Sequence, residues 1–167
     1  MDWKRFWRHV VMTPSRAAKC FPSSTLEAIQ RQIAAGEQRH SGEVVFIVES
    51  ELATNQLWDG LSPRDRAREV FAAHGVWNTE ANNGVLVYVL LADRAVEIVA
   101  DRGIDAVVET GAWRAICDAM DAHFHKGEYE AGAVSGVTAV SRLLETHFPA
   151  RPNGADRNEL PDKPVML

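Results

Sequence analysis

Cysteine is scarce in this sequence and forms no recognisable motif. The 167 residues include only Cys20 and Cys117. There is no CxxC pair, and no His or Cys stands at the spacing of a zinc finger, which excludes that class of domain. We therefore expect two free thiols and a reducing compartment.

Long apolar runs are also absent. No stretch approaches the roughly 20 apolar residues of a membrane-spanning helix. The first 20 residues lack the continuous apolar core and the small-residue cleavage site of a secretory signal. We expect a cytoplasmic protein, and the N-terminal segment leaves open a peripheral association with the inner membrane.

Basic residues are few outside the N-terminus. The formal net charge is −5, but residues 1–20 carry five Lys or Arg against one Asp, which leaves 13 basic and 22 acidic residues in the remainder. Affinity for nucleic acid rests on Lys and Arg that neutralise phosphates, so this acidic body argues against a nucleic-acid partner. It suits a cation-binding protein as well as an ordinary soluble one.

The N-terminal segment predicts an amphipathic helix. Residues 2–11 place five apolar side chains at the spacing of one helical face: Trp3, Phe6, Trp7, Val10 and Val11. Basic residues occupy the rest of the turn, a pattern typical of a helix lying on an anionic membrane, with Trp3, Phe6 and Trp7 at the headgroups. The same face would also dock on the domain or on a partner chain, and we favour docking.

The remaining residues predict one compact domain and a tail. With 46% apolar and 25% charged residues, the chain is long enough to bury a sizeable core. We divide it into a basic N-terminal helix (1–20), an α/β domain (21–149) and a flexible tail (150–167). The tail is inferred because residues 149–167 hold four of the seven prolines and show little periodicity.

Three apolar, β-branched segments predict strands at residues 43–49, 84–91 and 95–100, and periodic segments predict helices at residues 26–39, 62–74, 106–125 and 129–147. The first two strands flank a helix and should be parallel. The last two are joined by Ala92, Asp93 and Arg94 and should form a hairpin. This order predicts a three-layer α/β/α sandwich with a small mixed sheet flanked by helices on both faces.

Polar side chains gather where the hairpin begins and ends. An antiparallel pair brings the start of its first strand beside the end of its second. Asn82 and Asn83 should therefore lie close to Asp101, Arg102 and Asp105. This corner of the sheet is the candidate site.

Hard oxygen ligands at that corner predict a Ca²⁺ or Mg²⁺ site. The parallel first strand begins at the same end of the sheet, so the predicted ligands are Asp101, Asp105, Asn82, Asn83, Glu43 and His40. The structural alternative is that the two Asn residues form the turn into the strand, while Asp101 pairs with Arg102 or caps the next helix. Arg102, Trp77 and Trp58 are the predicted contacts for a ligand or partner.

Signatures of covalent catalysis are missing. There is no CxxxxxR loop, no DxD nucleophile pair and no GxSxG elbow. Cys117 falls mid-helix beside Ile116, which predicts a small core residue rather than a nucleophile. A phosphatase would have to work through a bound cation, with Asp101 or Asp105 as ligand and His40 or a neighbouring carboxylate as base.

Several segments, taken in order, resemble the TPM domain family, which is named for a thylakoid lumen protein, a photosystem repair factor and a receptor modulator. They are Trp77, Asn82-Asn83-Gly84-Val85-Leu86, Ile98-Val99-Ala100-Asp101-Arg102-Gly103-Ile104, Trp113, Gly127-Glu128-Tyr129 and LETHFP at residues 144–149. The resemblance covers about residues 22–149 and is closest to a short, cytoplasmic bacterial branch.

The resemblance implies an α/β/α sandwich, a role near membrane-protein maintenance or stress, Ca²⁺ or Mg²⁺ binding near the sheet edge and, as in a plant member, acid phosphatase activity. The Asp-containing turn usual before the first helix is replaced here by FPSST at residues 21–25, which weakens the carry-over of a metal or catalytic role. Two hypotheses follow. The favoured one is a non-catalytic binding or accessory module with a protein partner, which includes a membrane-associated one; the alternative is a weak, divalent-cation-dependent acid phosphatase.

Overall fold

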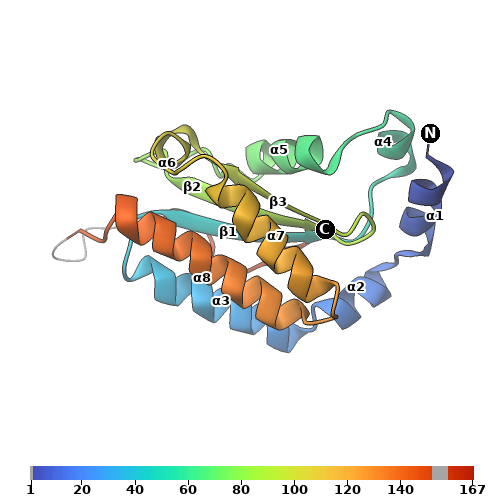
Figure 1. Cartoon of the computed structure of the whole chain (residues 1–167), viewed down its shortest axis with the longest axis horizontal. Helices are drawn as coiled ribbons and strands as arrows, with labels where there is room; N and C mark the ends of the chain where they lie inside the picture. Colours follow the sequence, from blue (N-terminus) through green and yellow to red (C-terminus); the bar gives the residue numbers. More distant parts are fainter. Residues whose placement is uncertain (1, 152–157) are drawn as a thin grey trace.

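The computed structural model describes residues 2–151 and 158–167, which form a sheet between two helical layers (Figure 1). The strands stand in the order β3-β2-β1-β4. Their bounds are Glu43–Glu49 (β1), Gly84–Leu90 (β2), Ala95–Ala100 (β3) and Val165–Met166 (β4). The α/β class predicted from the sequence, a small mixed sheet flanked by helices, is confirmed.

The register of the sheet follows the predicted pairing. β1 runs parallel to β2 with Glu43 opposite Gly84, and β2 runs antiparallel to β3 with Val85 opposite Ala100. Every residue of β1 and β2 is buried, as expected for central strands with both faces covered. The hairpin turn closes with Arg94 in the left-handed region, at φ 52°.

Side chains of alternate strand residues point to opposite faces of the sheet and belong to two separate hydrophobic cores. Val44, Phe46 and Val87 belong to a core shared with the helices of one face, whereas Ile47 and Tyr88 belong to a core on the opposite face. The first face is covered by α3 (Ser23–Glu37), α7 (Ala112–Phe124) and α8 (Tyr129–His147). The second face is covered mainly by α5 (Pro63–Ala73), which lies above the sheet in Figure 1.

Four short elements complete the chain: α1 (Trp3–Val11), α2 (Pro14–Cys20), α4 (Thr54–Trp58) and α6 (Arg102–Asp105). Helical structure in the predicted N-terminal segment (1–20) is confirmed, but it is divided into α1 and α2. The break falls at Met12 and Thr13, where Thr13 caps α2 and Pro14 occupies its first turn. The predicted helix at residues 106–125 begins only at Ala112. Gly111 adopts φ 92° immediately before it, a backbone that no right-handed helix passes through.

The C-terminal segment departs from the predicted flexible tail. Val165–Met166 pairs with Ile47 and Val48 of β1 as a parallel fourth strand. The backbone N–H of Leu167 donates to Val48 O at 2.8 Å. The segment covers an edge that β1 would otherwise expose. Its position is set by backbone hydrogen bonds, so the side-chain pattern of the sequence does not predict this strand. Residues 152–157 of the predicted tail lie outside the described residues.

No helix in the described part of the chain combines the length and apolarity needed to cross a membrane.

Candidate functional site

At the hairpin corner predicted from the sequence, backbone hydrogen bonds join the start of β2 to the residues that follow β3. The N–H of Asp101 donates to Gly84 O at 2.8 Å, and the N–H of Gly103 donates to Asn82 O at 2.9 Å. A Cβ added to Gly103 would stand 2.5 Å from Asn82 O and 2.7 Å from Ala81 O. Only glycine therefore allows α6 to lie this close to the start of β2.

The two asparagines hold the turn into β2. Asn82 adopts φ 51°, a left-handed backbone that Asn tolerates, and its Oδ1 accepts from Arg102 Nε at 3.2 Å. Asn83 is buried, and its Nδ2 donates to Ser41 O at 3.1 Å, which ties the turn to the residues before β1. Both residues thus fill the structural role considered as the alternative to metal binding.

The two aspartates are engaged by different partners. Asp101 Oδ1 accepts the Arg102 N–H at 2.8 Å and caps α6, while Asp105 Oδ1 accepts from Trp113 Nε1 at 3.1 Å. Asp101 Oδ2 and Asn83 Oδ1 are buried and have no hydrogen-bond partner within the described residues. These two oxygens are the acceptors that a cation or water at this corner would satisfy.

Glu43 and His40 lie at the same end of the sheet but serve other contacts. Glu43 is buried and accepts the backbone N–H groups of Glu159 and Leu160 at 3.0 and 3.1 Å, which fastens the C-terminal segment to β1. His40 Nδ1 lies 2.9 Å from Gly42 O, and burial lowers the pKa of the imidazole. The structure does not bring these two side chains onto Asp101 and Asp105.

A carboxylate cluster has formed beside Glu43. Burial, together with the charges of Glu43 and Asp162, raises the pKa of Glu37 to about 8. Asn158 Nδ2 donates to Asp162 Oδ1 at 2.6 Å and to Glu37 Oε2 at 3.3 Å. Glu37 is therefore largely protonated near neutral pH. Its hydrogen bond from Asn158 holds the C-terminal segment against α3.

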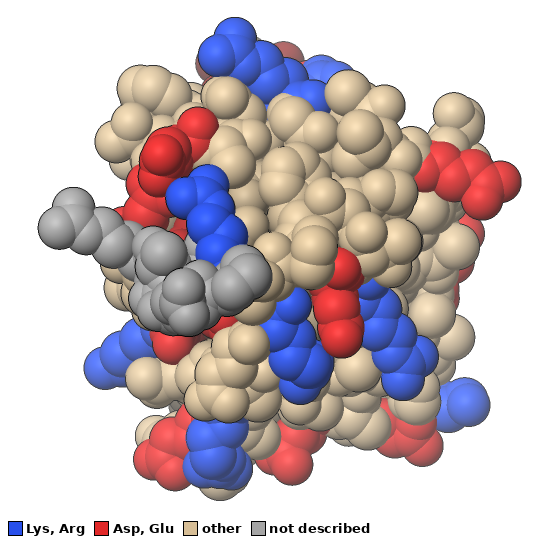
Figure 2. Space-filling view, turned by 90° about the vertical axis from the view of Figure 1, so that its left-hand side faces the viewer, with Lys and Arg blue, Asp and Glu red and all other residues tan. Residues whose placement is uncertain are grey.

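Within residues 2–151 and 158–167, no group of three or more His, Cys, Asp or Glu is arranged to hold a metal ion. The end of the molecule that carries α6 shows charged side chains of both signs dispersed around an uncharged area rather than one acidic patch (Figure 2). The Ca²⁺ or Mg²⁺ site remains a prediction.

The aromatic residues predicted as partner contacts lie on the surface. Trp58, on α4, is 69% exposed and Trp77 is 55% exposed. Trp77 Nε1 donates to Ala72 O at 3.3 Å, so its ring is fixed against the end of α5. Both indoles are accessible.

A second cluster, which the sequence did not predict, lies at the turn of the hairpin. The Asp93 carboxylate, 6% exposed, accepts two hydrogen bonds from Arg5 Nε, at 2.9 and 3.1 Å, and a third from Arg5 Nη2 at 2.7 Å. Arg8 Nη2 reaches the same carboxylate at 3.2 Å. Burial acts to raise the pKa of Asp93, but the hydrogen bonds from His9 and Arg5 outweigh it and hold this pKa well below its usual range.

His9 completes the attachment of α1. Its Nε2 lies 3.1 Å from Asp93 Oδ1, and its Nδ1 accepts the N–H of Leu52 at 2.9 Å. Because Nδ1 is an acceptor, the imidazole is neutral with its proton on Nε2. Nδ1 is therefore occupied and does not serve as a general base.

A third group of polar residues lies at the carboxyl end of β1. Glu49 accepts bonds from Arg66 Nε at 2.9 Å and Nη2 at 2.9 Å, and it also accepts from the Tyr88 hydroxyl. Burial and the bond to Glu49 raise the pKa of Tyr88 well above its usual range. The triad is internally satisfied and fixes α5 to the sheet.

The attachment to Asp93 reverses the expected orientation of α1. Its polar residues Arg5 and His9 face the domain, together with the half-buried Phe6. Trp3 and Trp7 point outward, 64% and 59% exposed, and so do Val10 and Val11. The sequence placed Phe6 on one face with the two Trp residues. In the structure the Phe6 ring stays in edge-to-face contact with Trp3 and Trp7, at centroid distances of 5.7 and 6.0 Å, while it packs against the domain.

Comparison with known proteins decides the family. A model described as the TPM domain matches residues 15–143. The chain belongs to the TPM domain family. The match confirms the resemblance seen in the sequence and spans β1, β2, β3 and the helices packed on them.

Solved structures support the same assignment. The chain is 30% identical to the BA42 protein of the psychrophilic bacterium Bizionia argentinensis, with a TM-score of 0.72 over 87% of this chain and 94% of that one. It is 25% identical to the N-terminal domain of a protein from P. gingivalis, with a TM-score of 0.60 over 78% of this chain and 80% of that one. No curated protein matches the chain.

The family match sets α1 apart from the TPM domain proper. It begins at residue 15, after α1 has ended at Val11, while Asp93 lies inside it. Arg5 and His9 thus attach a segment that precedes the matched TPM region to the hairpin within that region. The sequence shows an Asp in the hairpin turn. It gives no local indication that this Asp binds Arg5, which lies 88 residues earlier in the chain.

Proposed function

We propose that this TPM-domain protein is a non-catalytic binding module that docks on an anionic membrane surface through the outward face of α1. The observation that carries the proposal is the reversed helix, whose charged side binds the domain while Trp3 and Trp7 face solvent. Contiguous exposed apolar side chains on a soluble domain mark an interaction surface. The family's link to membrane-protein maintenance and stress agrees with such a location.

The rigid mounting of α1 favours binding. Arg5 and His9 both contact Asp93, so the helix is fixed at two successive turns of its inner face. A helix already folded and oriented loses less conformational entropy on binding than a disordered segment does. The Trp3 and Trp7 side chains are therefore presented together before any contact is made.

The charge around this face suits an anionic surface. Lys4 is exposed on α1, and α2 adds the exposed Arg16 and Lys19. The sequence contains no Asp or Glu between residues 3 and 26. Indole rings lodge at the headgroup level, and each basic residue near an anionic bilayer contributes about 1 kcal/mol.

The candidate nucleophile and base support a non-catalytic role. Cys117 is buried, and burial raises the pKa of its thiol to about 11, so the thiolate is scarce at neutral pH. His40, the predicted base, is buried, with its Nδ1 2.9 Å from Gly42 O. Asp105 is bonded to Trp113, and Asp101 caps α6.

Vesicle flotation of the full chain tests the proposal. We expect co-flotation with phosphatidylglycerol-containing vesicles, little with pure phosphatidylcholine, and a loss of at least tenfold in bound fraction for Trp3→Ser/Trp7→Ser. The control is Trp58→Ser, which removes an exposed indole from α4 and should bind as the parent does. Equal binding by all three proteins, or binding by none, would reject the membrane surface and leave a protein partner as the occupant of this face.

Cation binding at the hairpin corner is a second candidate, favoured by the unpartnered buried oxygens of Asn83 and Asp101. Ca²⁺ and Mg²⁺ accept such amide and carboxylate oxygens. Calorimetric titration of metal-free protein should show binding that Asp101→Asn abolishes. Hydrolysis of a chromogenic phosphate ester that requires the cation, and disappears in Asp101→Asn/Asp105→Asn, would favour the phosphatase alternative.

A further inference from the structure

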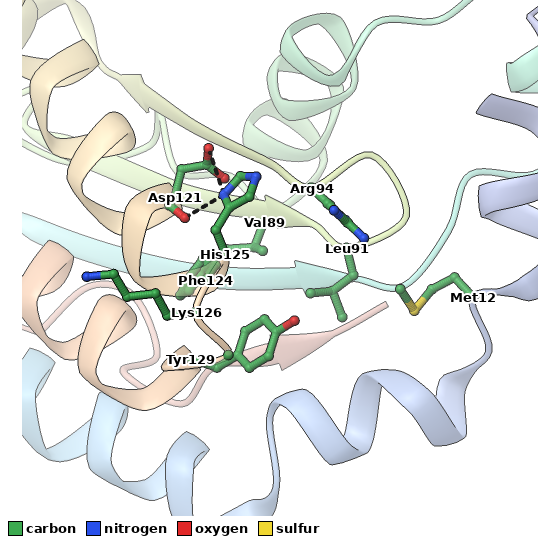
Figure 3. A pocket seen from close by; sticks show the side chains of 10 residues that line it. Met12, Val89, Leu91, Arg94, Asp121, Phe124, His125, Lys126 and Tyr129 are labelled. Carbon is green, nitrogen blue, oxygen red and sulfur yellow. Dashed lines mark hydrogen bonds and ion pairs between the residues drawn. The ribbon is translucent and has the colours of Figure 1, made fainter. Parts of the chain in front are cut away.

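A cavity of about 410 Å³ lies between the hairpin turn and the loop that joins α7 to α8 (Figure 3). Its size falls in the range of roughly 300–1,000 Å³ typical of small-molecule sites. The apolar walls are Met12, Val89, Leu91 and Phe124. Its lining includes none of the hairpin-corner residues and neither Trp3 nor Trp7, although Met12 directly follows α1.

The exposed Arg94 side chain reaches the cavity. The Arg94 guanidinium points inward from the hairpin turn, facing the Tyr129 hydroxyl on the opposite wall (Figure 3). Within the described part of the chain, the Arg94 side chain makes no hydrogen bond or ion pair. Its charge is felt across the cavity, because it acts to lower the pKa of Tyr129.

The other charged groups at the cavity do not cancel Arg94. The Asp121 carboxylate has its own partner, since His125 Nδ1 lies 3.3 Å from its Oδ2 and 2.8 Å from its backbone oxygen. Burial and contact with Cys20 raise the pKa of Tyr129 to about 12, so the phenol stays neutral. Lys126 stands at the rim and adds a further positive charge.

The backbone does not require an arginine at this position. Arg94 adopts φ 52°, a left-handed conformation that favours Gly or Asn. A large cationic side chain is therefore held in the turn at some conformational cost. The guanidinium is well suited to binding a carboxylate, sulfonate or phosphate.

We propose that this cavity binds a small amphiphile with one anionic head group, the head on Arg94 beside Tyr129 and the apolar body against Val89, Leu91 and Phe124. A medium-chain carboxylate is the simplest such ligand. Each part of the ligand has its own contact: the anionic head pairs with the exposed Arg94, and the apolar body covers the apolar walls.

The test uses 8-anilinonaphthalene-1-sulfonate, an anionic aromatic fluorophore, titrated into the full chain. We expect saturable fluorescence enhancement that octanoate displaces, while 1-octanol and acetate displace it at least tenfold less well. Displacement by octanol at the same concentration as octanoate would overturn the role of Arg94. An absence of saturable binding would overturn the site.

Two variants separate binding from folding. Arg94→Asn should weaken fluorophore binding at least tenfold with a melting temperature equal to or above that of the parent, because Asn is favoured at this φ. Arg142→Asn is the matched control: Arg142 is exposed on α8, about 20 Å along that helix from Tyr129, and its loss should change nothing. Equal weakening by both variants would contradict a specific site.

A further variant distinguishes dye binding in the cavity from dye binding on the outward face of α1. In Trp3→Ser/Trp7→Ser the outward face of α1 is removed while the cavity is untouched, so fluorophore binding should persist. Loss of the signal in that variant would mean that the dye binds the α1 face and would overturn the cavity site. Failure of vesicle flotation would leave the cavity result unaffected.

Discussion

Arg5 and Asp93 are 88 residues apart in sequence and form a bidentate ion pair, with Arg5 Nη2 2.7 Å from Asp93 Oδ2 and Arg5 Nε 3.1 Å from Asp93 Oδ1. The pair joins a helix outside the matched TPM region to the turn of the central hairpin. Everything proposed for the outward face of α1 depends on it, because the pair decides which face of the helix meets solvent.

Removal of this carboxylate should therefore detach α1. Asp93→Asn should lower the free energy of unfolding by about 2 kcal/mol, since a buried acceptor of three donors is lost while Arg5 regains water. Urea unfolding measures the effect. In a cycle with Arg5→Gln, the double variant should cost less than the sum of the single ones, and strict additivity would contradict a direct pair.

The cluster at the other end of β1 predicts a pH dependence. The pKa of Glu37 is raised from an ordinary 4.5 to about 8 by burial and by the charges of Glu43 and Asp162. The folded state thus binds this proton more tightly than the unfolded state does, so the stabilising contribution is complete below pH 4.5 and is lost as pH rises through 8. Glu37→Gln should flatten the decline in stability over that window, as measured by chemical unfolding at a series of pH values. An unchanged slope would show that Glu37 is not the titrating group.

Gly103 is predicted to be intolerant of any side chain. A Cβ would stand 2.5 and 2.7 Å from backbone oxygens, which have no flexible end to move aside. Gly103→Ala should cost about 1–3 kcal/mol in thermal or chemical unfolding. A variant as stable as the parent would mean that α6 does not pack on the turn at Asn82 as described.

The two thiols should differ in reactivity. Cys117 is buried with its pKa raised to about 11, whereas Cys20 is partly accessible. An aromatic disulfide reagent at pH 8 should modify one thiol of the native protein quickly and the second only after unfolding. Cys20→Ser should abolish the fast phase, and a fast phase that survives would place a reactive thiol at Cys117.

The sequence predicted well what local pattern determines. Runs of apolar, β-branched residues marked β1, β2 and β3, and the short connection between the last two indicated the hairpin. The corner followed from strand direction alone, which is why Asn82 and Asp101 were placed together. The roles of their side chains did not follow, because a carboxylate that caps α6 and one that binds a cation look the same in sequence.

Long-range contacts supplied the rest. The alternation of polar and apolar residues identified α1 as amphipathic, but which face binds the domain depends on Asp93, and no local signal gives that partner. The C-terminal strand was missed for a related reason, because two residues that pair through their backbone leave no periodicity to detect. The cavity at Arg94 is assembled from the end of β2 and the hairpin turn, the end of α7, the start of α8 and Met12, which only the fold brings together.

Tryptophan quenching by brominated lipid tests the central claim most directly. In a Trp58→Phe/Trp77→Phe variant the exposed indoles are Trp3 and Trp7, while Trp113 is half-buried. With phosphatidylglycerol vesicles carrying bromine on the upper acyl chain, we predict a blue shift and strong quenching of emission, both lost when Trp3 and Trp7 are also replaced by Phe. Emission that neither shifts nor is quenched at saturating lipid would contradict docking of α1 on the membrane.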